Sequence, residues 1–443
     1  MRPLKKNNFG PRAGFVYQLT PKTVLSSGYG LIWIEMAGIT TPFTTPTFPF
    51  LQTASQRALD NVTPAFVLKN GPSVTPVGPT ADAGLGQGVF AVNAGLGSGY
   101  AQQWNVSAQR QITSNTTFEA AYVGSKITHI GIPDSNLNQL TVDQLAQGSS
   151  LLTKVSNPYF GIIPRSSSLG DPTITRAQLM KPYPAYTTVS LYRNNVGTTR
   201  YDGFTLSVRQ RWARGLSYSI AYTRSKLIDD ASSVFDASIL TGPVADFQIA
   251  DSFDLGRERD YSTGDIPNVF VSSVVWDVPY GRGRAHQLEG WVGALANDWT
   301  FTSIITLQSG MPVAITQVTN FNAFAGFGVQ RPNIVGDPNL PKDERTTSYW
   351  FDTTAFQEAP QFTLGSASRN PVRGPSYRNV DLAVMRRVPI GATRDVEARV
   401  EIFNLLNTAQ FGQPVGVRGA ANFGTIIAAF DPRVVQLALK FHF

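Results

Sequence analysis

Residues 433–443 read RVVQLALKFHF. Every second side chain of a β-strand points to the same face. One face therefore carries only apolar residues, namely Val435, Leu437, Leu439, Phe441 and Phe443, and the other carries Gln436, Ala438, Lys440 and His442. Because chain ends usually fray into water, an apolar terminal strand is uncommon in soluble domains. A transmembrane β-barrel strand has lipid on one side and a wet lumen on the other, so the pattern favours that structure over a half-buried edge strand of a soluble sheet.

The composition is typical of a protein with many strands and turns. Of the 443 residues 42% are hydrophobic and 15% are charged, whereas soluble domains have about 25% charged residues. Gly (39) and Pro (29) are abundant, as turns require. The net charge of +7 comes from arginines scattered along predicted strands, which does not predict nucleic-acid binding. The absence of Cys excludes disulfides and thiolate metal sites.

Membrane-spanning helices are not expected, because no stretch approaches the roughly eighteen apolar residues that such a helix needs. Barrel strands need only about nine to eleven residues, with every second one apolar. The start of the chain, MRPLKKNNFGPRAGF, has no apolar core of a signal peptide. Since an outer-membrane protein must be exported, either the membrane interpretation is wrong or Met1 is not the true start.

The predicted strands come in pairs that are joined by short links rich in Gly, Pro, Asn and Ser, the residues that tight turns use. The pairs are 11–19 with 22–34, 100–112 with 116–128, 199–212 with 216–228, 268–280 with 298–309, and 377–388 with 393–405. Long irregular connections lie between them, near residues 35–99, 129–198, 229–267, 310–376 and 406–432. Loops of this length are uncommon in compact soluble domains. Outer-membrane barrels, in contrast, have short periplasmic turns and long extracellular loops.

We therefore predict an all-β fold, an antiparallel transmembrane β-barrel with about eleven strands in this chain. If the short turns are periplasmic, the first and the last predicted strand both descend towards the periplasm. Bacterial single-chain barrels have an even number of strands, because both chain ends lie on one side. The odd number predicts that residues 1–443 are an incomplete outer-membrane β-barrel domain.

Polar residues alternate with apolar ones along these strands. The residues that we expect to face the lumen are Arg209, Arg211, Glu397, Arg399, Glu401 and Lys440. The alternation weakens between Val269 and Val278, so the orientation of that strand stays open. Aromatic residues gather near strand ends, where amphipathic rings would form girdles at the membrane interfaces. The predicted girdle contains Tyr17, Trp33, Trp212, Trp276, Tyr280 and Trp299.

Nine stretches in this order resemble the TonB-dependent receptors of Gram-negative bacteria, specifically the Oar-like group, whose members carry a carboxypeptidase-regulatory-like domain ahead of the plug and barrel. They are NNFGPRAGFVYQL with KTVLSSGYGLIW (7–19 and 22–33), YAQQWNVSAQRQI with TFEAAYVGSK (100–112 and 117–126), YDGFTLSVRQRWARGLSYSIAYTRSK (201–226), VPYGRGR (278–284), WTFTSIITLQSGMPV (299–313), VEARVEIFNLLNTAQFGQP (396–414) and FGTIIAAFDPRVVQLALKFHF (423–443). The resemblance covers nearly the whole chain.

The resemblance implies a barrel of about 22 strands, of which this chain would be the carboxy-terminal half. It implies transport of a large substrate across the outer membrane, powered through TonB. The plug, the TonB box and the regulatory domain do not occur in this sequence, so a TonB complex would be a partner only through a missing plug. The resemblance also implies that the barrel-assembly machinery reads the final strand at Val435, Leu437, Leu439, Phe441 and Phe443. The other expected partner is outer-membrane lipid.

No catalytic, cofactor or transition-metal site is expected. The chain has three His residues, His129, His286 and His442, which are far apart in sequence. It has no Glu-x-x-His pattern, Gly-x-Ser-x-Gly elbow or P-loop. The densest acidic group is Asp246, Asp251, Asp254, Glu258, Asp260 and Asp265, with Arg257 and Arg259 between them. Because it lacks the regular Asp spacing of a Ca²⁺ loop, we interpret it as a mixed-charge surface loop, with Ca²⁺ binding as the alternative.

Three other functions stay open from the sequence. A passive porin or adhesin would need an even number of strands and its own export signal. A soluble all-β surface module would dissolve without detergent. An enzyme would need a catalytic constellation, which the sequence does not contain. The transported substrate cannot be read from the loops.

Overall fold

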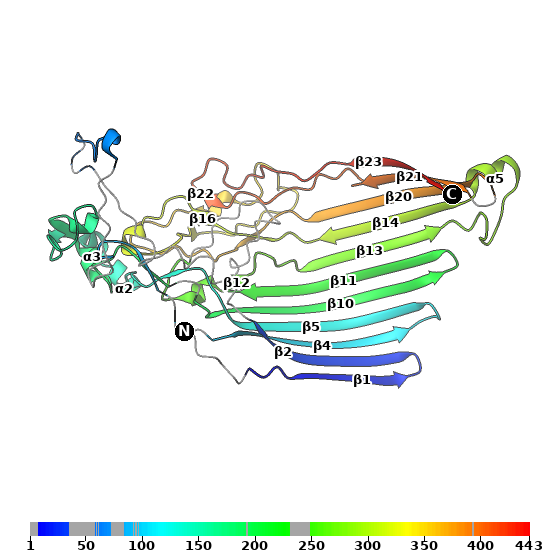
Figure 1. Cartoon of the computed structure of the whole chain (residues 1–443), viewed down its shortest axis with the longest axis horizontal. Helices are drawn as coiled ribbons and strands as arrows, with labels where there is room; N and C mark the ends of the chain where they lie inside the picture. The colour runs from blue at the N-terminus through cyan, green and yellow to red at the C-terminus, as the bar shows by residue number, and fades with distance from the viewer. Residues whose placement is uncertain are drawn as a thin grey trace.

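The computed structural model describes residues 8–34, 58, 60, 62–71, 84–91, 93, 95, 97–191, 194–230, 249–391 and 394–443. One large antiparallel sheet dominates it, and its strands are neighbours in chain order (Figure 1). They are β1 (Arg12–Thr20), β2 (Thr23–Ile34), β4 (Gly99–Gln111), β5 (Thr116–Ile130), β10 (Gly197–Ala213), β11 (Leu216–Asp229), β13 (Asn268–Asp277), β14 (Trp299–Gln308), β20 (Tyr377–Pro389), β21 (Asp395–Phe403) and β23 (Val434–His442). A short strand, β12 (Asp260–Tyr261), also pairs with β11. The predicted strand pairs and the antiparallel all-β fold are confirmed.

The turn between β10 and β11 shows how the short links work. Arg214 and Gly215 have positive φ angles of 51° and 76°, the combination that a two-residue type I′ turn requires and that matches the twist of the flanking strands. Short links also join β1 to β2, β4 to β5, and β20 to β21. Figure 1 shows these turns at one end of the sheet and the long connections at the other end.

The strand register separates the two faces of the sheet, because directly opposite residues share a face. On β23, Leu437 lies opposite Val400, and Leu439 lies opposite Ala398. From strand to strand the same face continues as an apolar surface, which we call the apolar face. Its members include Tyr17, Leu25, Val106, Tyr122, Leu206, Ile220, Val274, Phe301, Val384, Val400 and Leu437, one from each strand of the path.

The register also settles the orientation of β13, which the sequence left open. Val274 and Trp276 lie opposite Tyr218 and Leu216 of β11, so they belong to the apolar face. Val271 and Val275 point to the other face, which we call the polar face. The weak alternation therefore has a simple cause, because β13 places valines on both faces.

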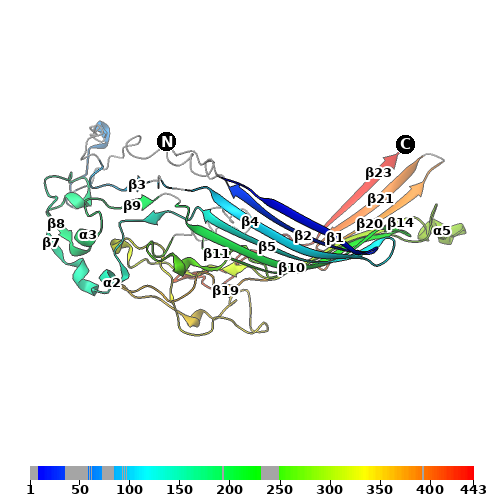
Figure 2. The same ribbon diagram turned by 90° about the horizontal axis from the view of Figure 1, so that it is seen from below.

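The sheet is curved but open. In the described part of the chain β1 pairs only with β2, and β23 pairs only with β21. Figure 1 shows β1 and β23 at opposite edges, both running towards the short-turn end, and Figure 2 shows the curvature. The predicted count of about eleven strands agrees with the eleven strands of the path.

The long connections are not irregular, as the sequence had suggested, but contain short elements of their own. These are η1 (Leu68–Asn70), β3 (Val89–Ala91), β6 (Ser135–Asn136), α2 (Val142–Leu145), η2 (Gly148–Leu152), β7 (Lys154–Ser156), η3 (Ser168–Gly170), β8 (Thr173–Thr175), α3 (Arg176–Met180), β9 (Val189–Leu191), η4 (Leu255–Glu258), β15 (Pro312–Val313), β16 (Thr316–Gln317), η5 (Ala323–Ala325), β17 (Asn333–Ile334), η6 (Thr353–Ala355), β18 (Phe356–Gln357), β19 (Val372–Arg373) and β22 (Val417–Arg418). Several of them pack around buried apolar clusters, one of which contains Ile315, Phe351 and Phe356. The prediction of irregular loops missed these clusters because each one combines residues from distant segments.

The link between β13 and β14 carries the helix α5 (Gly290–Ala296) at the short-turn end (Figure 1). Trp299 donates a hydrogen bond from Nε1 to the carbonyl of Leu295, 2.7 Å away, which ties this helix to β14. No helix in the described segments is long and apolar enough to cross a membrane.

Candidate functional site

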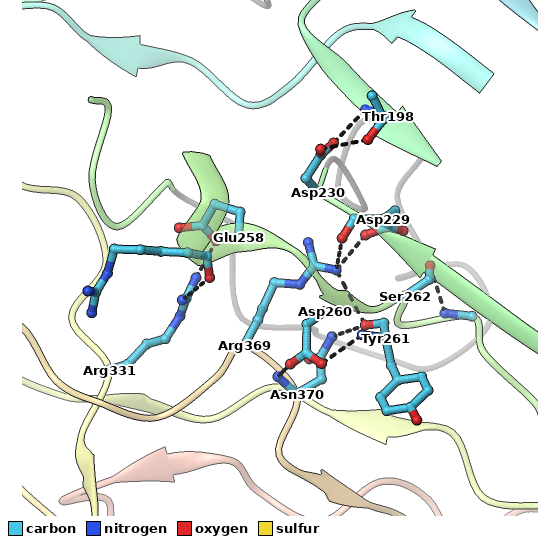
Figure 3. Close-up of polar contacts among 12 residues, drawn as sticks. Thr198, Asp229, Asp230, Glu258, Asp260, Tyr261, Ser262, Arg331, Arg369 and Asn370 are labelled. Atoms are coloured by element: carbon cyan, nitrogen blue, oxygen red, sulfur yellow. Dashed lines mark hydrogen bonds and ion pairs between the residues drawn. The ribbon is translucent and has the colours of Figure 1, made fainter. Parts of the chain in front are cut away.

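Four parts of the long connections, residues 131–191, 249–267, 309–376 and 404–433, lie at one end of the sheet, and we call their described residues the loop cap. A group of ion pairs and hydrogen bonds in this cap lies next to the end of β11 (Figure 3). Three arginines from residues 331–373 meet three carboxylates from residues 229–265 there: Arg369 pairs with Asp229, Arg331 with Glu258, and Arg373 with Asp265.

The first pair attaches the cap directly to the sheet. Asp229 is the last residue of β11, and its carboxylate accepts a hydrogen bond from Nη2 of Arg369. The same nitrogen lies 3.3 Å from the carbonyl oxygen of Tyr261 in β12. Next to it, the backbone amide nitrogen of Asn370 donates a hydrogen bond to the Asp260 carboxylate at 2.7 Å. One short segment of the cap is therefore bonded to both β11 and β12.

The second pair is the most buried. The side chains of Glu258 and Arg331 are each only 5% exposed. Glu258 also accepts a hydrogen bond from the Ala250 amide at 3.0 Å, and Arg331 donates to the Arg257 carbonyl at 2.9 Å. Burial lowers the pKa of Arg331, because it disfavours the charged guanidinium, and the Glu258 carboxylate counteracts this effect.

The third pair joins the cap to β11 at a second position. Asp265 is 1% exposed and lies 2.5 Å from Nη2 of Arg373. Its other carboxylate oxygen accepts a hydrogen bond from the Leu227 amide of β11 at 2.6 Å. Breaking a buried ion pair by removing one partner costs about 3–5 kcal/mol, because the other charge is left buried. The first and third pairs therefore hold the loop cap on β11, and the second pair joins two segments of the cap to each other.

The interpretation of the acidic segment as a mixed-charge surface loop is wrong. Asp251, Glu258 and Asp265 are 2%, 4% and 1% exposed. Their carboxylates bond to side chains or backbone groups of other segments; Asp251, for example, accepts from Gln139 at 2.6 Å. Asp246 lies outside the described residues. Among the residues that the structure describes, no group of three or more His, Asp or Glu side chains is arranged to hold a metal ion.

Sequence reasoning found Glu258 and Asp265 but missed Asp229 and the three arginines of this site. Each arginine is isolated in a long connection, 73 to 140 residues from the partner to which it bonds. The only local signal is the concentration of acidic residues itself, which requires positive partners when it is buried.

Gly365 allows the cap to pack closely at this site. A Cβ atom on Gly365 would lie 1.9 Å from the carbonyl oxygen of Arg331. We expect Gly365→Ala to destabilise the cap by about 1–3 kcal/mol, because the backbone that carries Arg331 must move. Hydrogen exchange of residues 325–335 would report the change. Gly391, where a Cβ meets open space, provides the control, and equal exchange in both variants would contradict the prediction.

Five of the six residues predicted to face the lumen follow the strand register. Glu397 lies opposite Lys440, and its carboxylate is 3.1 Å from Nε of Arg387. Arg399 is 3.2 Å from Glu401. Arg209, on β10, lies opposite Ser219 and shares the polar face with them. Arg211 lies within a register shift and donates to the Ser114 carbonyl of the neighbouring turn. That the polar face borders a lumen stays a prediction.

The predicted girdle residues lie at both ends of the sheet. Trp276 and Trp299 are on the apolar face at the short-turn end, where Trp276 stacks on Phe301 with ring centroids 5.8 Å apart. Trp33 lies at the opposite end, and its ring centroid is 5.4 Å from that of Tyr100. The remaining members, Tyr17, Trp212 and Tyr280, are exposed near the short turns. Contact of these rings with membrane interfaces stays a prediction.

An antiparallel sheet with one apolar face across all its long strands, short turns at one end and a folded cap at the other describes an outer-membrane β-barrel protein. The sequence model of the outer membrane beta barrel domain matches residues 2–436. The chain therefore belongs to the outer membrane β-barrel domain family, and its location is the outer membrane of a Gram-negative bacterium. No curated protein sequence matches the chain.

Several solved structures are similar in outline. The outer membrane transporter YddB from Escherichia coli has a TM-score of 0.43 and 10% identity, with 94% of this chain and 38% of that chain covered. The ferric-catecholate import receptor Fiu from E. coli K12 has a TM-score of 0.39 and 10% identity, with 98% and 34% covered. The FrpB iron transporter from Neisseria meningitidis has a TM-score of 0.39 and 11% identity, with 98% and 39% covered. The chain thus spans less than two fifths of the length of these proteins.

Proposed function

We propose that this chain forms part of the wall and the surface loops of a TonB-dependent transporter of the Oar-like group. Its barrel would be completed by strands outside this sequence. The sequence motifs described above support the group. The loop cap would make first contact with the substrate, and Arg209, Glu397, Arg399, Glu401 and Lys440 would line the lumen.

The observation that carries this proposal is the direction of the two edge strands. β1 and β23 both run towards the short turns, because an antiparallel path of eleven strands begins and ends in the same direction. Direct pairing of β1 with β23 would therefore be parallel. Antiparallel pairing at both edges, with β1 and with β23, needs an odd number of further strands. The two of these that pair with β1 and β23 must run away from the short turns. A second copy inserted in the same orientation offers descending strands at both edges and does not meet this requirement.

Eleven further strands would give a barrel of 22. Barrels of that size have a wide lumen that a plug domain fills, which supports energised transport over a passive pore. In this proposal the plug and the regulatory domain belong to the missing part, and the TonB complex contacts the plug. The barrel-assembly machinery would read β23, whose apolar residues stand at a free edge.

The proposal is tested on the protein as the bacterium makes it, purified from outer membranes in detergent. We expect an intact mass well above the 48.1 kDa of this chain, little steady conductance in planar bilayers, and cross-links between the protein and TonB. A mature protein of 48.1 kDa with a steady open conductance would favour the passive porin instead. Recovery in the soluble fraction without detergent would favour the surface module.

A further inference from the structure

Four exposed cationic residues lie on the apolar face near its loop end, on three neighbouring strands: Lys126 on β5, Arg200 on β10, and Arg224 and Lys226 on β11. Lys126 is directly opposite Arg200. Lys226 is opposite Asp202, and Arg224 is opposite Phe204. Because opposite residues share a face, all four belong to one surface, which we call the basic patch.

The basic patch lies where the apolar band ends. Tyr122 and Tyr222 lie on the apolar face at this boundary, and their hydroxyl groups form hydrogen bonds to polar residues nearer the loop end. The Tyr122 hydroxyl donates to Asp202 at 2.6 Å, and the Tyr222 hydroxyl donates to Asn268 at 2.8 Å. Tyrosines with an apolar body and a bonded polar tip are typical of a membrane–water interface. The patch is therefore at the height of lipid headgroups.

The positive charge of the patch is largely uncompensated. Arg200 pairs with Asp202 at 2.8 Å, whereas Arg224 donates to the neutral amide oxygen of Asn268 at 2.9 Å. Lys226 lies over the ring of Tyr261, 5.3 Å from its centroid. No ion pair forms between a described carboxylate and Lys126, Arg224 or Lys226. Like charges directly opposite in a sheet, such as Lys126 and Arg200, destabilise it, unless an anion lies between them.

The polar face offers a direct comparison. There, Arg387 and Arg399 are both paired with carboxylates of β21. These two arginines of the polar face are neutralised by carboxylates, whereas of the four cations of the basic patch only Arg200 has an ion pair with a described carboxylate. A surface of Lys and Arg beside apolar residues is complementary to an anionic lipid, because ammonium and guanidinium groups bind phosphate through charge-assisted hydrogen bonds.

We propose that the basic patch binds the phosphate groups of a glycolipid in the outer leaflet of the outer membrane. Lys126, Arg224 and Lys226 supply cations without an ion pair to a described carboxylate, and Arg200 adds donors that Asp202 does not use. This assignment rests on the proposed orientation, in which the loop cap is extracellular. A partner protein with an acidic surface is the competing occupant.

Native mass spectrometry of the protein extracted from outer membranes in mild detergent measures the lipid that stays bound. The test variant is Lys126→Gln/Arg224→Gln/Lys226→Gln. The control, Arg209→Gln/Arg387→Gln/Lys440→Gln, removes the same charge from the polar face. We expect the test variant to retain glycolipid at least about tenfold less than wild type, since each lost contact is charge-assisted, and the control to stay near wild type. Equal retention by all three proteins would overturn the proposal.

A second measurement needs no variant. Wild-type protein is stripped of lipid and then offered bisphosphorylated or dephosphorylated lipid A. The proposal predicts binding of the phosphorylated form only, and equal binding of both forms contradicts it. If the test variant keeps its glycolipid but loses a cross-linked acidic protein, the patch is a protein site instead. If the protein had the reversed orientation, with the loop cap in the periplasm, it would retain phospholipid in place of glycolipid. If the transport proposal failed, the conductance would differ from the expected value, but lipid retention would not change.

Discussion

Leu437→Arg/Leu439→Arg is expected to abolish insertion of the protein into the outer membrane. Both leucines lie on the apolar face of β23 and are 75% and 76% exposed. An arginine on the lipid side of a barrel costs about 2–4 kcal/mol near the midplane, and both positions are central in Val434–His442. Two such costs approach the total stability of a typical protein, about 5–15 kcal/mol. The measurement is the heat-modifiable folded band in isolated outer membranes.

The control for this prediction lies on the same strand. Gln436→Arg/Ala438→Arg adds the same charge on the polar face, where Gln436 lies opposite Glu401, and Ala438 opposite Arg399. This variant should insert at close to the wild-type level, because Glu401 offsets the new charge at position 436 and the like charges at positions 438 and 399 cost at most about 1 kcal/mol. If the leucine variant formed as much folded barrel as the control, the apolar face would not contact lipid.

Glu258→Ala should loosen the loop cap, because it breaks the ion pair that joins two segments of the cap. The variant leaves the guanidinium of Arg331, whose side chain is 5% exposed, without its carboxylate. We expect a loss of about 3–5 kcal/mol in the stability of the cap. Limited proteolysis and hydrogen exchange of residues 310–376 would detect this loss, and the strands should keep their protection, because β11 and its neighbours do not depend on Glu258.

Two further variants separate charge burial from simple loss of a contact. Glu258→Met/Arg331→Met removes both charges and should keep most of the stability of the cap, since an apolar pair can replace a buried ion pair. Glu401→Ala breaks a half-exposed pair with Arg399 and should cost less than about 1 kcal/mol. Protection of residues 310–376 in Glu258→Ala equal to that in wild type would show that the buried pair does not hold the cap.

The two edges of the described sheet and the loop cap differ in how complete their contacts are. The edges of the described sheet are open to further strands, whereas the cap is already bonded to β11 through Asp229 and Asp265. A cap with its own buried clusters can keep its shape while the wall is completed around it. In the proposed transporter, the surface loops would be preformed before a substrate arrives.

The sequence by itself determined the strands, their pairing and most of their facing. Period-two alternation and turn residues are local properties, so β21, β23 and the β10–β11 hairpin could be predicted from segments of about twenty residues. The membrane location was expected from the same patterns, whereas the family rests on the match of the outer membrane β-barrel domain model to residues 2–436. Where the local pattern is weak, as in β13 with valines on both faces, the sequence left the orientation open.

Only the tertiary structure decided how the long connections fold. Asp229 and Arg369 are 140 residues apart in the sequence. The strands β16 and β22, which pair in parallel, are also far apart, since Thr316 lies opposite Val417. Neither contact has a local signal, because an isolated arginine or a two-residue strand looks the same in a surface loop and in a buried one. The same reason explains why the acidic segment was interpreted as exposed. Burial of a charge depends on a partner elsewhere in the chain, and spacing along the sequence does not reveal which partner arrives.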